Sequence, residues 1–211
     1  MITGGVRRPP PRRLLISRRA VLQAALRIVD DEGLDALRIR RLGEELGVNG
    51  ASLYHHFASK DEILAGVAEL ALQYVRTPDT RHEDWPQWLL RNNVRTRAAL
   101  LEHPNLIPVV MARAPLGIGT SMLESSANLL VEQGVPVEMV LPLMETMEMA
   151  AVSSAMYGDR VARGGAAHLD HHDHPTLLAG HDRRADVDEQ LFVETSVAII
   201  EAVRRRIAGR G

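Results

Sequence analysis

The segment LRIRRLGEELGVNGASLYHHF, residues 37–57, carries the strongest local pattern in this chain. Gly47 ends a first short helix, because a residue without Cβ leaves a helix at little steric cost. Asn49 then caps a second helix of about eight residues, and Val48 packs between the two as an apolar wedge. The apolar spacing suits two short helices and no strand, with Leu37, Leu42, Leu46, Val48, Leu53 and Phe57 at the repeating positions. The segment is therefore predicted to be a helix-turn-helix.

The second helix of this motif, residues 50–57, has one apolar and one polar side. Leu53 and Phe57 are the side chains to bury. The opposite side presents hydroxyl, phenol and imidazole groups, which suit phosphates and base edges. These groups belong to Ser52, Tyr54, His55 and His56. Residues 50–57 are interpreted as a DNA-recognition helix, although most helical hairpins of this spacing touch no DNA, so the flanking sequence has to support the interpretation.

Sequence on both sides extends the motif into a small helical head. Upstream, an apolar stripe over residues 20–29 follows Ser17, which can cap a helix, and stops at Gly33. Downstream, Ser59 and Glu62 have the spacing of a capping box that starts another helix. Three short helices and a longer fourth, joined by minimal loops, are the layout of a three-helix DNA-reading domain with a connector.

Residues 37–60, together with the helix before them, resemble the DNA-binding domain of the tetracycline-repressor (TetR) family. The resemblance rests on the turn at Gly47 and Val48, the LYHHF segment at residues 53–57, and Lys60 three residues beyond it. It implies an all-helical, homodimeric, ligand-responsive transcriptional regulator, usually a repressor. The implied partners are double-stranded DNA with a palindromic operator and a small-molecule inducer, and no membrane.

Side-chain chemistry and the resemblance together assign the expected DNA contacts. Tyr54 and Lys60 match the family's phosphate-contacting tyrosine and lysine. His55 is expected to face DNA, whereas His56 is left open between a DNA contact and a histidine packed under the hairpin. The full expected set is Arg40, Asn49, Gly50, Ala51, Ser52, Tyr54, His55, His56 and Lys60.

The residues at the two helix starts carry separate expectations. Arg40 and Arg41 begin the first helix of the motif, where a helix N-terminus favours phosphate. Ile39 occupies the cap position, which in the family is commonly Ser or Thr. Gly50 and Ala51 are too small to read a base, and they are expected to permit close approach or a methyl contact with thymine.

Composition favours an all-α protein. With 211 residues, the chain has room for one small and one larger domain. Aromatic residues make up only 3%, so aliphatic side chains must build the core, which favours helices over strands rich in aromatic and β-branched residues. The absence of cysteine excludes disulfides, zinc–thiolate sites and thiol catalysis. Without a signal peptide or an apolar run of membrane-spanning length, the protein is expected to be cytoplasmic.

Charge is divided unevenly along the chain. Residues 1–60 hold 11 Lys+Arg against 6 Asp+Glu, a net of +5, and residues 61–211 hold 14 against 21, a net of −7. A basic first quarter on an acidic remainder is typical of a small DNA-reading head on a body that does not bind DNA. The alternative is a chance asymmetry with a basic tail, since six of the arginines precede residue 20.

Three regions are expected: a disordered basic arm at residues 1–16, a helix-turn-helix DNA-binding domain at 17–62, and a helical ligand-binding and dimerisation domain at 63–211. The fold class is therefore an N-terminal three-helix head on a larger helical domain. A connector helix is expected at 60–76, and body helices at 85–101, 105–112, 120–133, 136–157 and 187–207. Residues 158–186 are expected to form a flexible, His-rich loop.

The expected helix at 136–157 is apolar almost all round and must be covered on every side. A chain of this size has few helices to cover it, so a second subunit is expected. The helices at 136–157 and 187–207 would then pair with their symmetry mates in a four-helix interface. Leu143 and Val197 are expected in that interface.

The segment at residues 88–103 resembles the helix with which tetracycline-binding members of the family contact the drug, with Asn93 at the place of a contacting asparagine. Val110 and Arg76 stand where those members have a magnesium-chelating histidine and a second pocket histidine, so magnesium–tetracycline is not expected. A bulkier apolar ligand is expected instead, without a cofactor or a bound metal. The expected ligand residues are Trp88, Asn93, Arg97, Val110, Met144 and Met147.

Two other functions draw on parts of the sequence. Histidines and aspartates within residues 158–186 could ligate the metal of a small metal-dependent hydrolase. They are His168, His171, His172, His174, His181, Asp170, Asp173 and Asp182. No HxxxH or HExxH lies on an expected helix, which opposes an enzyme. The other alternative, a helical adaptor that has lost DNA binding, is opposed by Tyr54 and Lys60.

Overall fold

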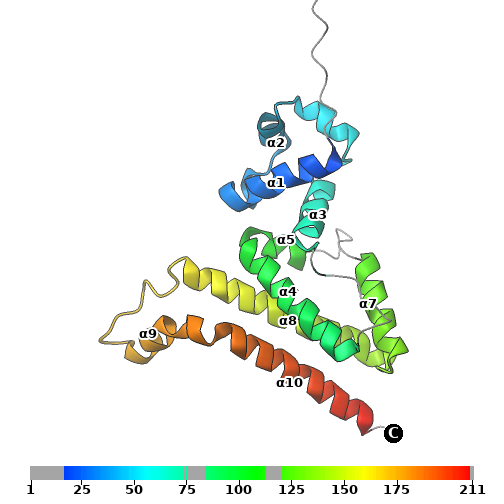
Figure 1. Ribbon diagram of the computed structural model, residues 1–211. Helices are drawn as coiled ribbons and strands as arrows, with labels where there is room; N and C mark the ends of the chain where they lie inside the picture. Colours follow the sequence, from blue (N-terminus) through cyan, green and yellow to red (C-terminus); the bar gives the residue numbers. More distant parts are fainter. Residues whose placement is uncertain (1–16, 74, 76–83, 113–119, 210–211) are drawn as a thin grey trace, which may run out of the picture.

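The computed structural model describes residues 17–73, 75, 84–112 and 120–209, and every regular element in these ranges is a helix. The arm expected at residues 1–16 and the side chain of Arg76 lie outside the described residues. Figure 1 shows a small N-terminal head above a larger body, with α3 leading from one to the other. The all-α fold class is confirmed.

Five helices build the head, and three of them start at the expected capping residues. The side chains of Ser17, Asn49 and Ser59 each accept a backbone N–H at 3.0 to 3.1 Å. Such caps satisfy backbone donors that have no partner within the first turn of a helix. The head elements are α1 (Arg18–Glu32), η1 (Leu34–Ala36), α2 (Ile39–Leu46), η2 (Gly50–His55) and α3 (Lys60–Ala71).

Three details of the head differ from the expectation. α2 begins at Ile39, with Arg38 in the cap position and no side-chain cap, so Ile39 is the first helical residue and not the cap. η2 is a 3₁₀-helix of six residues, whereas a helix of about eight residues was expected. α3 ends at Ala71, short of the end expected at residue 76.

Two glycines let α2 and η2 approach closely. Gly47 ends α2 with φ of +65°, a left-handed conformation that residues with a side chain rarely adopt. Gly43 lies inside α2 against the turn. A Cβ at Gly43 would lie 2.9 Å from the carbonyl oxygen of Val48 and 3.1 Å from the nitrogen of Gly50. The hairpin therefore depends on direct contact between backbones.

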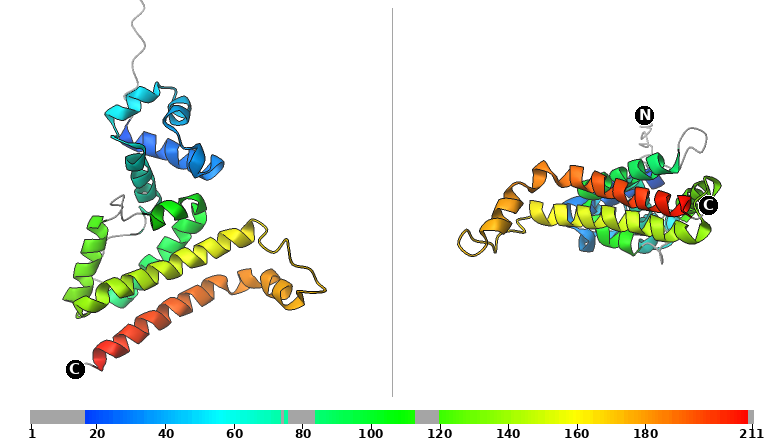
Figure 2. Two further views of the ribbon diagram at one scale, coloured as in Figure 1. Left: turned by 180° about the vertical axis from the view of Figure 1, so that it is seen from behind. Right: turned by 90° about the horizontal axis from the view of Figure 1, so that it is seen from below.

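The body is a bundle of long helices. α4 packs mainly against α8, and α10 runs beside α8 at the edge farthest from the head (Figure 2). The body elements are α4 (Trp85–Glu102), η3 (Pro104–Leu106), α5 (Ile107–Met111), α7 (Thr120–Glu132), α8 (Val137–Ala162), α9 (Pro175–Asp182), η4 (Arg184–Asp186) and α10 (Asp188–Ala208). None of the described helices combines the length and the apolar character that crossing a membrane requires.

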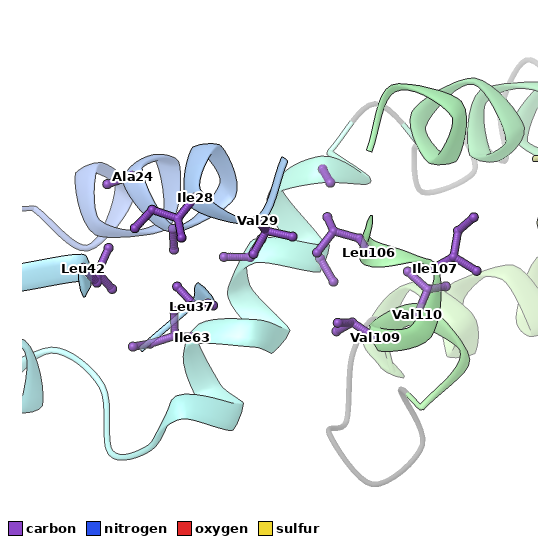
Figure 3. Close-up of a cluster of buried hydrophobic side chains, with 14 of the residues drawn as sticks. Ala24, Ile28, Val29, Leu37, Leu42, Ile63, Leu106, Ile107, Val109 and Val110 are labelled. Atoms are coloured by element: carbon purple, nitrogen blue, oxygen red, sulfur yellow. The ribbon is translucent and has the colours of Figure 1, made fainter. Parts of the chain in front are cut away.

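One hydrophobic core runs from the head into the body without a break. In Figure 3, Ile28 and Val29 of α1 and Ile63 of α3 lie on the head side, and Leu106 and Val109 lie on the body side. These five residues, here called the junction core, are at most 4% exposed. A fully buried aliphatic side chain contributes roughly 1.5–3 kcal/mol. Head and body are therefore packed against each other as one unit at this junction.

The region at residues 158–186 is not one continuous loop. Residues 158–162 continue α8, and α9 with η4 occupies residues 175–182 and 184–186. Gly158, at which the loop was expected to begin, lies inside α8. A Cβ at Gly158 would lie 2.9 Å from Cδ2 of Leu101 in α4, and the helix continues past this glycine.

α8 and α10 keep an apolar surface that the rest of the described chain does not cover. Met149 and Met156 of α8 are 66% and 47% exposed, Tyr157 is 50% exposed, and Leu191 of α10 is 59% exposed. These four residues are called the outer face. Val197 of α10 is also 39% exposed. Leu143, which was expected in the subunit interface, is 3% exposed and belongs to the body core, because its side of α8 faces the bundle interior.

Replacing Gly43 by alanine tests the close approach of α2 and the turn. Gly43→Ala should lower the free energy of unfolding by roughly 1–3 kcal/mol, because the added methyl group meets backbone atoms that cannot rotate away. Urea unfolding followed by circular dichroism measures the change. Gly180→Ala in α9 is the control, since nothing lies within 4 Å of a Cβ there. Equal stability of the two variants would contradict the packing described for α2.

Candidate DNA interface and ligand cavity

The segment η2 presents polar groups outward from a buried base. Leu53 and Phe57 are 1% and 2% exposed and anchor the segment in the head. Tyr54, between them in sequence, is 57% exposed. The expected DNA residues that are exposed are Arg40, Asn49, Ala51, Tyr54, His55, His56 and Lys60, and Ser52 is half-buried. The structure thus gathers these groups on and around one short helix.

Two residues of the expected set need separate treatment. The side chain of His56 is exposed, so it is not the packed histidine that the sequence left open. Gly50 is half-buried, and a Cβ there would lie 3.0 Å from Cγ2 of Ile39. Gly50 therefore permits the close packing of η2 on α2, because the Cβ of any other residue at this position would point at α2.

Arg18, which sequence analysis did not single out, braces the end of η2. Its guanidinium donates to the carbonyl oxygen of His56 at 2.6 Å and to Oε1 of Glu62 at 2.7 Å. The same group stacks on the ring of Phe57, 4.2 Å from the ring centre. The only local signal was an arginine directly after the cap of α1, which does not reveal partners 38 and 44 residues away.

Glu62 completes this brace from the first turn of α3. Its Oε2 accepts the N–H of Ala58 at 2.6 Å, one residue before the cap Ser59. The N–H of Ala58 first, and the guanidinium of Arg18 second, hold the pKa of Glu62 below its usual range. The stability that this carboxylate provides is therefore present above its unfolded-state pKa and is lost as the pH falls through its folded-state pKa.

Arg41 is not free for phosphate, contrary to the expectation. Its guanidinium binds Glu32 of α1 with donor–acceptor distances of 2.5 to 3.2 Å and Glu45 of α2 at 3.0 Å. These bonds fasten α2 to the end of α1. Arg40, by contrast, is 91% exposed and has only a long contact of 3.6 Å with Glu44.

A cavity of about 420 Å³ lies in the body between α4, α7 and α8. Five of the six expected ligand residues line it: Trp88, Asn93, Val110, Met144 and Met147. The side-chain nitrogen of Asn93 donates to Oγ of Ser196 at 3.0 Å, so this wall of the cavity is tied to α10. The cavity is within the size range of small-molecule sites.

Arg97 is the sixth expected ligand residue, and it does not line the cavity. Its guanidinium forms an ion pair with Asp188 of α10, and its Nε donates to Oγ of Ser154 in α8 at 2.8 Å. It also lies over the ring of Phe192, 5.2 Å from the ring centre. The reason is the position of its partners, since Asp188 and Phe192 belong to α10 and Ser154 belongs to α8.

The acidic residues of the cavity were not predicted from the sequence. Glu124 of α7 and Glu145 and Glu148 of α8 all line it. Spacing gave a signal for two of them, since Met144, Glu145 and Glu148 share one face of a helix. Leu72 and Val75, which follow α3, also line the cavity.

The His-rich region holds no metal centre in the part of the chain that the structure describes. No group of three or more His, Asp or Glu side chains there is arranged to bind a metal ion. Two pairs of His and Asp side chains lie near each other, His174 Nδ1 to Asp170 Oδ2 at 3.7 Å and His172 Nε2 to Asp173 Oδ1 at 3.9 Å. The metal-dependent hydrolase therefore gains no support from the described residues.

An exposed recognition segment on a helix-turn-helix, joined to a helical body with an internal cavity, defines a class of two-part helical proteins. The family model for bacterial regulatory proteins of the tetR family matches residues 21–67. The model for the tetracyclin repressor-like C-terminal domain matches residues 77–173. The chain belongs to the TetR family.

Individual relatives agree with this assignment. Tetracycline repressor protein class C of Escherichia coli is 38% identical over 90 residues, 42% of this chain and 41% of that repressor's length. An HTH-type transcriptional repressor of Mycobacterium tuberculosis is 28% identical over 151 residues, 68% of this chain and 57% of its own length. The matches thus span roughly two fifths to three fifths of these curated relatives.

Solved structures share the fold over most of their length. Mycobacterium smegmatis BioQ has a TM-score of 0.64 and 26% identity, covering 87% of this chain and 99% of that chain. A structure of BioQ with its double-stranded DNA operator has a TM-score of 0.59 at the same identity. A TetR variant from Acinetobacter baumannii, solved with minocycline, has a TM-score of 0.69 at 21% identity, covering 91% and 98% of the two chains.

The brace around Arg18 predicts local protection of η2. Arg18→Ala should speed hydrogen–deuterium exchange at the amides of His56 and Phe57 roughly fivefold, because a hydrogen bond of this kind contributes about 1 kcal/mol. Arg19→Ala removes the same charge from the next residue and should leave these amides unchanged. Equal exchange in the two variants would show that Arg18 does not hold the segment.

Proposed function

We propose that this protein is a transcriptional regulator that binds double-stranded DNA as a homodimer and is released from a palindromic operator by a small molecule. One observation carries the proposal: a recognition segment with exposed polar side chains stands on a core that continues to the wall of a ligand-sized cavity. The repressors among its relatives, and the BioQ structure with its operator, support the same function.

DNA contact is assigned to the exposed groups of η2 and the cations beside it. Tyr54 and His55 lie on the outward side of η2 and are suited to phosphates and base edges in the major groove. Lys60 and Arg40 are exposed cations at the start of α3 and in the first turn of α2, which suits the phosphate backbone.

Dimerisation is assigned to the outer face of α8 and α10. Four large apolar side chains between 47% and 66% exposed are a surface that a soluble protein usually covers with a partner. A twofold axis through this surface buries the same residues from both subunits. It also sets two heads at a fixed separation, as two half-sites of an operator require.

Coupling between cavity and head passes through α5 and α3. Val110 of α5 lines the cavity and packs in the same hydrophobic cluster as the junction core. Leu72 lines the cavity directly after α3, whose first residue is Lys60. A ligand that prefers one tilt of these helices changes the position of the head, whereas equal affinity for both arrangements would change nothing.

The junction is also fastened by polar contacts. Nδ1 of His103 lies 3.0 Å from Oδ2 of Asp30 in α1, and Nδ2 of Asn105 donates to the carbonyl oxygen of Val29 at 2.8 Å. A shift of η3 and α5 is therefore transmitted to α1.

In this proposal the protein senses the bound molecule and does not convert it chemically. The protein acts in the cytoplasm, where its DNA is found.

Lys60 provides the test of DNA docking. Lys60→Ala should weaken binding to all operator variants to a similar degree and lower the slope of log K against log salt by about one, because one phosphate contact is lost. Fluorescence anisotropy with labelled DNA from upstream of the protein's own gene measures both quantities. Arg183→Ala, an exposed cation of the body, is the charge-matched control. An altered base preference with an unchanged salt slope would contradict the assignment of Lys60.

The outer face provides the test of assembly. Met149→Arg and Leu191→Arg should give monomers in sedimentation velocity and weaken operator binding by at least about tenfold, since an arginine must lose its hydration in the apolar interface. Val131→Arg in α7 is the control, because Val131 is also an exposed apolar residue, at 45%, but lies outside the outer face. A wild-type protein that sediments as a monomer at micromolar concentration would contradict the homodimer.

A further inference from the structure

We propose that a second cavity, where α1 and the end of α3 meet α4, binds a small organic carboxylate with an apolar body. This cavity has a volume of about 350 Å³ and is here called the junction site. Its lining includes Leu26 of α1, Leu70 and Ala71 of α3, and Arg95, Glu102 and His103 in or directly after α4. The inference rests on the proposed function only for its consequence at DNA.

The junction site is separate from the cavity between α4, α7 and α8. Its lining from α4 follows the i, i+3, i+4, i+7 spacing of one helical face, with Arg95, Ala98, Ala99 and Glu102. A different face of α4 lines the other cavity, and no described residue lines both. A ligand of the junction site is therefore recognised by its own set of side chains.

The unpaired guanidinium of Arg95 is the observation that selects an anion. Arg95 is half-buried, and its Nη1 is buried without a hydrogen-bond partner among the described residues. Arg97, two residues further along α4, is by contrast held by Asp188. A buried donor of a charged group is destabilising unless an acceptor satisfies it. Because Arg95 also lines the junction site, an anion bound there supplies that acceptor.

The rest of the lining selects a carboxylate on an apolar body. A planar guanidinium presents parallel N–H donors that match the two oxygens of a carboxylate. Leu26, Leu70 and Ala71 form an apolar wall, against which the hydrated oxygens of a phosphate would lose water without compensation. Glu102 is exposed and lies seven residues from Arg95, roughly 10 Å along the helix, so it does not neutralise the guanidinium.

The junction site contacts the elements that position the head. Leu70 and Ala71 lie in the last turn of α3, whose first residue is Lys60. His103, also on the lining, holds Asp30 of α1 through Nδ1 at 3.0 Å. A bound molecule therefore touches head and body at once. A carboxylate that fits one arrangement of the two better than another shifts the balance between them.

Two probes of nearly equal shape test the ligand class: 3-phenylpropionate and its neutral amide, 3-phenylpropionamide. Titration of the DNA-free protein, labelled with ¹³C at the methyl groups of Leu, Ala and Met, should show the carboxylate binding at least about tenfold more tightly. The methyl signals of Leu26, Leu70 and Ala71 should shift, and those of Met144 and Met147 in the other cavity should not. Equal binding of the two probes, tighter binding of inorganic phosphate, or shifts confined to the two methionines would overturn the proposal.

Variants of the lining test the role of Arg95. Arg95→Gln should weaken binding of 3-phenylpropionate at least about tenfold without lowering the melting temperature, because Nη1 has no bond to lose. Arg204→Gln, which removes the same charge from an exposed position of α10, is the control and should bind like the wild type. Ala98→Trp fills the site from an exposed position and should abolish binding. A less stable Arg95→Gln variant that binds with wild-type affinity would show a structural role only and overturn the site.

A DNA measurement separates this inference from the proposed function. Affinity for labelled DNA from upstream of the protein's own gene is measured with and without saturating 3-phenylpropionate. The carboxylate should change the affinity of the wild type at least about fivefold and leave that of Arg95→Gln unchanged. A protein that binds the carboxylate but no DNA would refute the regulator and keep the junction site. A protein that binds DNA but not the carboxylate would refute the junction site alone.

Discussion

The continuous apolar packing between head and body is the constraint on which the rest of this structure depends. Ile28 and Val29 of α1 meet Leu106 and Val109 across the same cluster that holds Ile63 of α3. Aliphatic side chains of the two parts meet directly in this cluster, and closely packed interiors transmit displacement instead of absorbing it. The recognition segment is consequently positioned by the body, although it lies at the opposite end of α3.

This packing connects both the cavity and the outer face of the body to the head. Val110 belongs to the same hydrophobic cluster and also lines the cavity, so a molecule in the cavity contacts the structure that holds the head. α4 links the cavity to α10 through Asn93 and Ser196, and it links α8 to α10 through Arg97. The outer face is thereby fixed to the same framework as the wall of the cavity.

Most of the helical layout could be predicted from the sequence because its determinants are local. Caps at Ser17, Asn49 and Ser59 and the turn at Gly47 act on backbone groups within about four residues, and each appears where it was expected. The limits of α3 and α8 were less predictable. Gly158 illustrates why: a glycine ends α2 at position 47 and lies inside α8 at position 158, and the residue type alone does not distinguish the two.

By itself, then, the sequence determined the all-helical fold and the helix-turn-helix, and five of the six ligand residues expected from it line the cavity, because helical periodicity and short-range capping are encoded within a few turns. The tertiary structure alone decided which charged side chains are held in ion pairs and hydrogen bonds. It pairs Arg97 with Asp188, 91 residues away, braces His56 with Arg18, 38 residues away, and turns Leu143 inward. It also brings Glu124 to the same cavity as Glu145 and Glu148. These outcomes depend on how helices cross, and no local pattern specifies which side of one helix meets a distant partner.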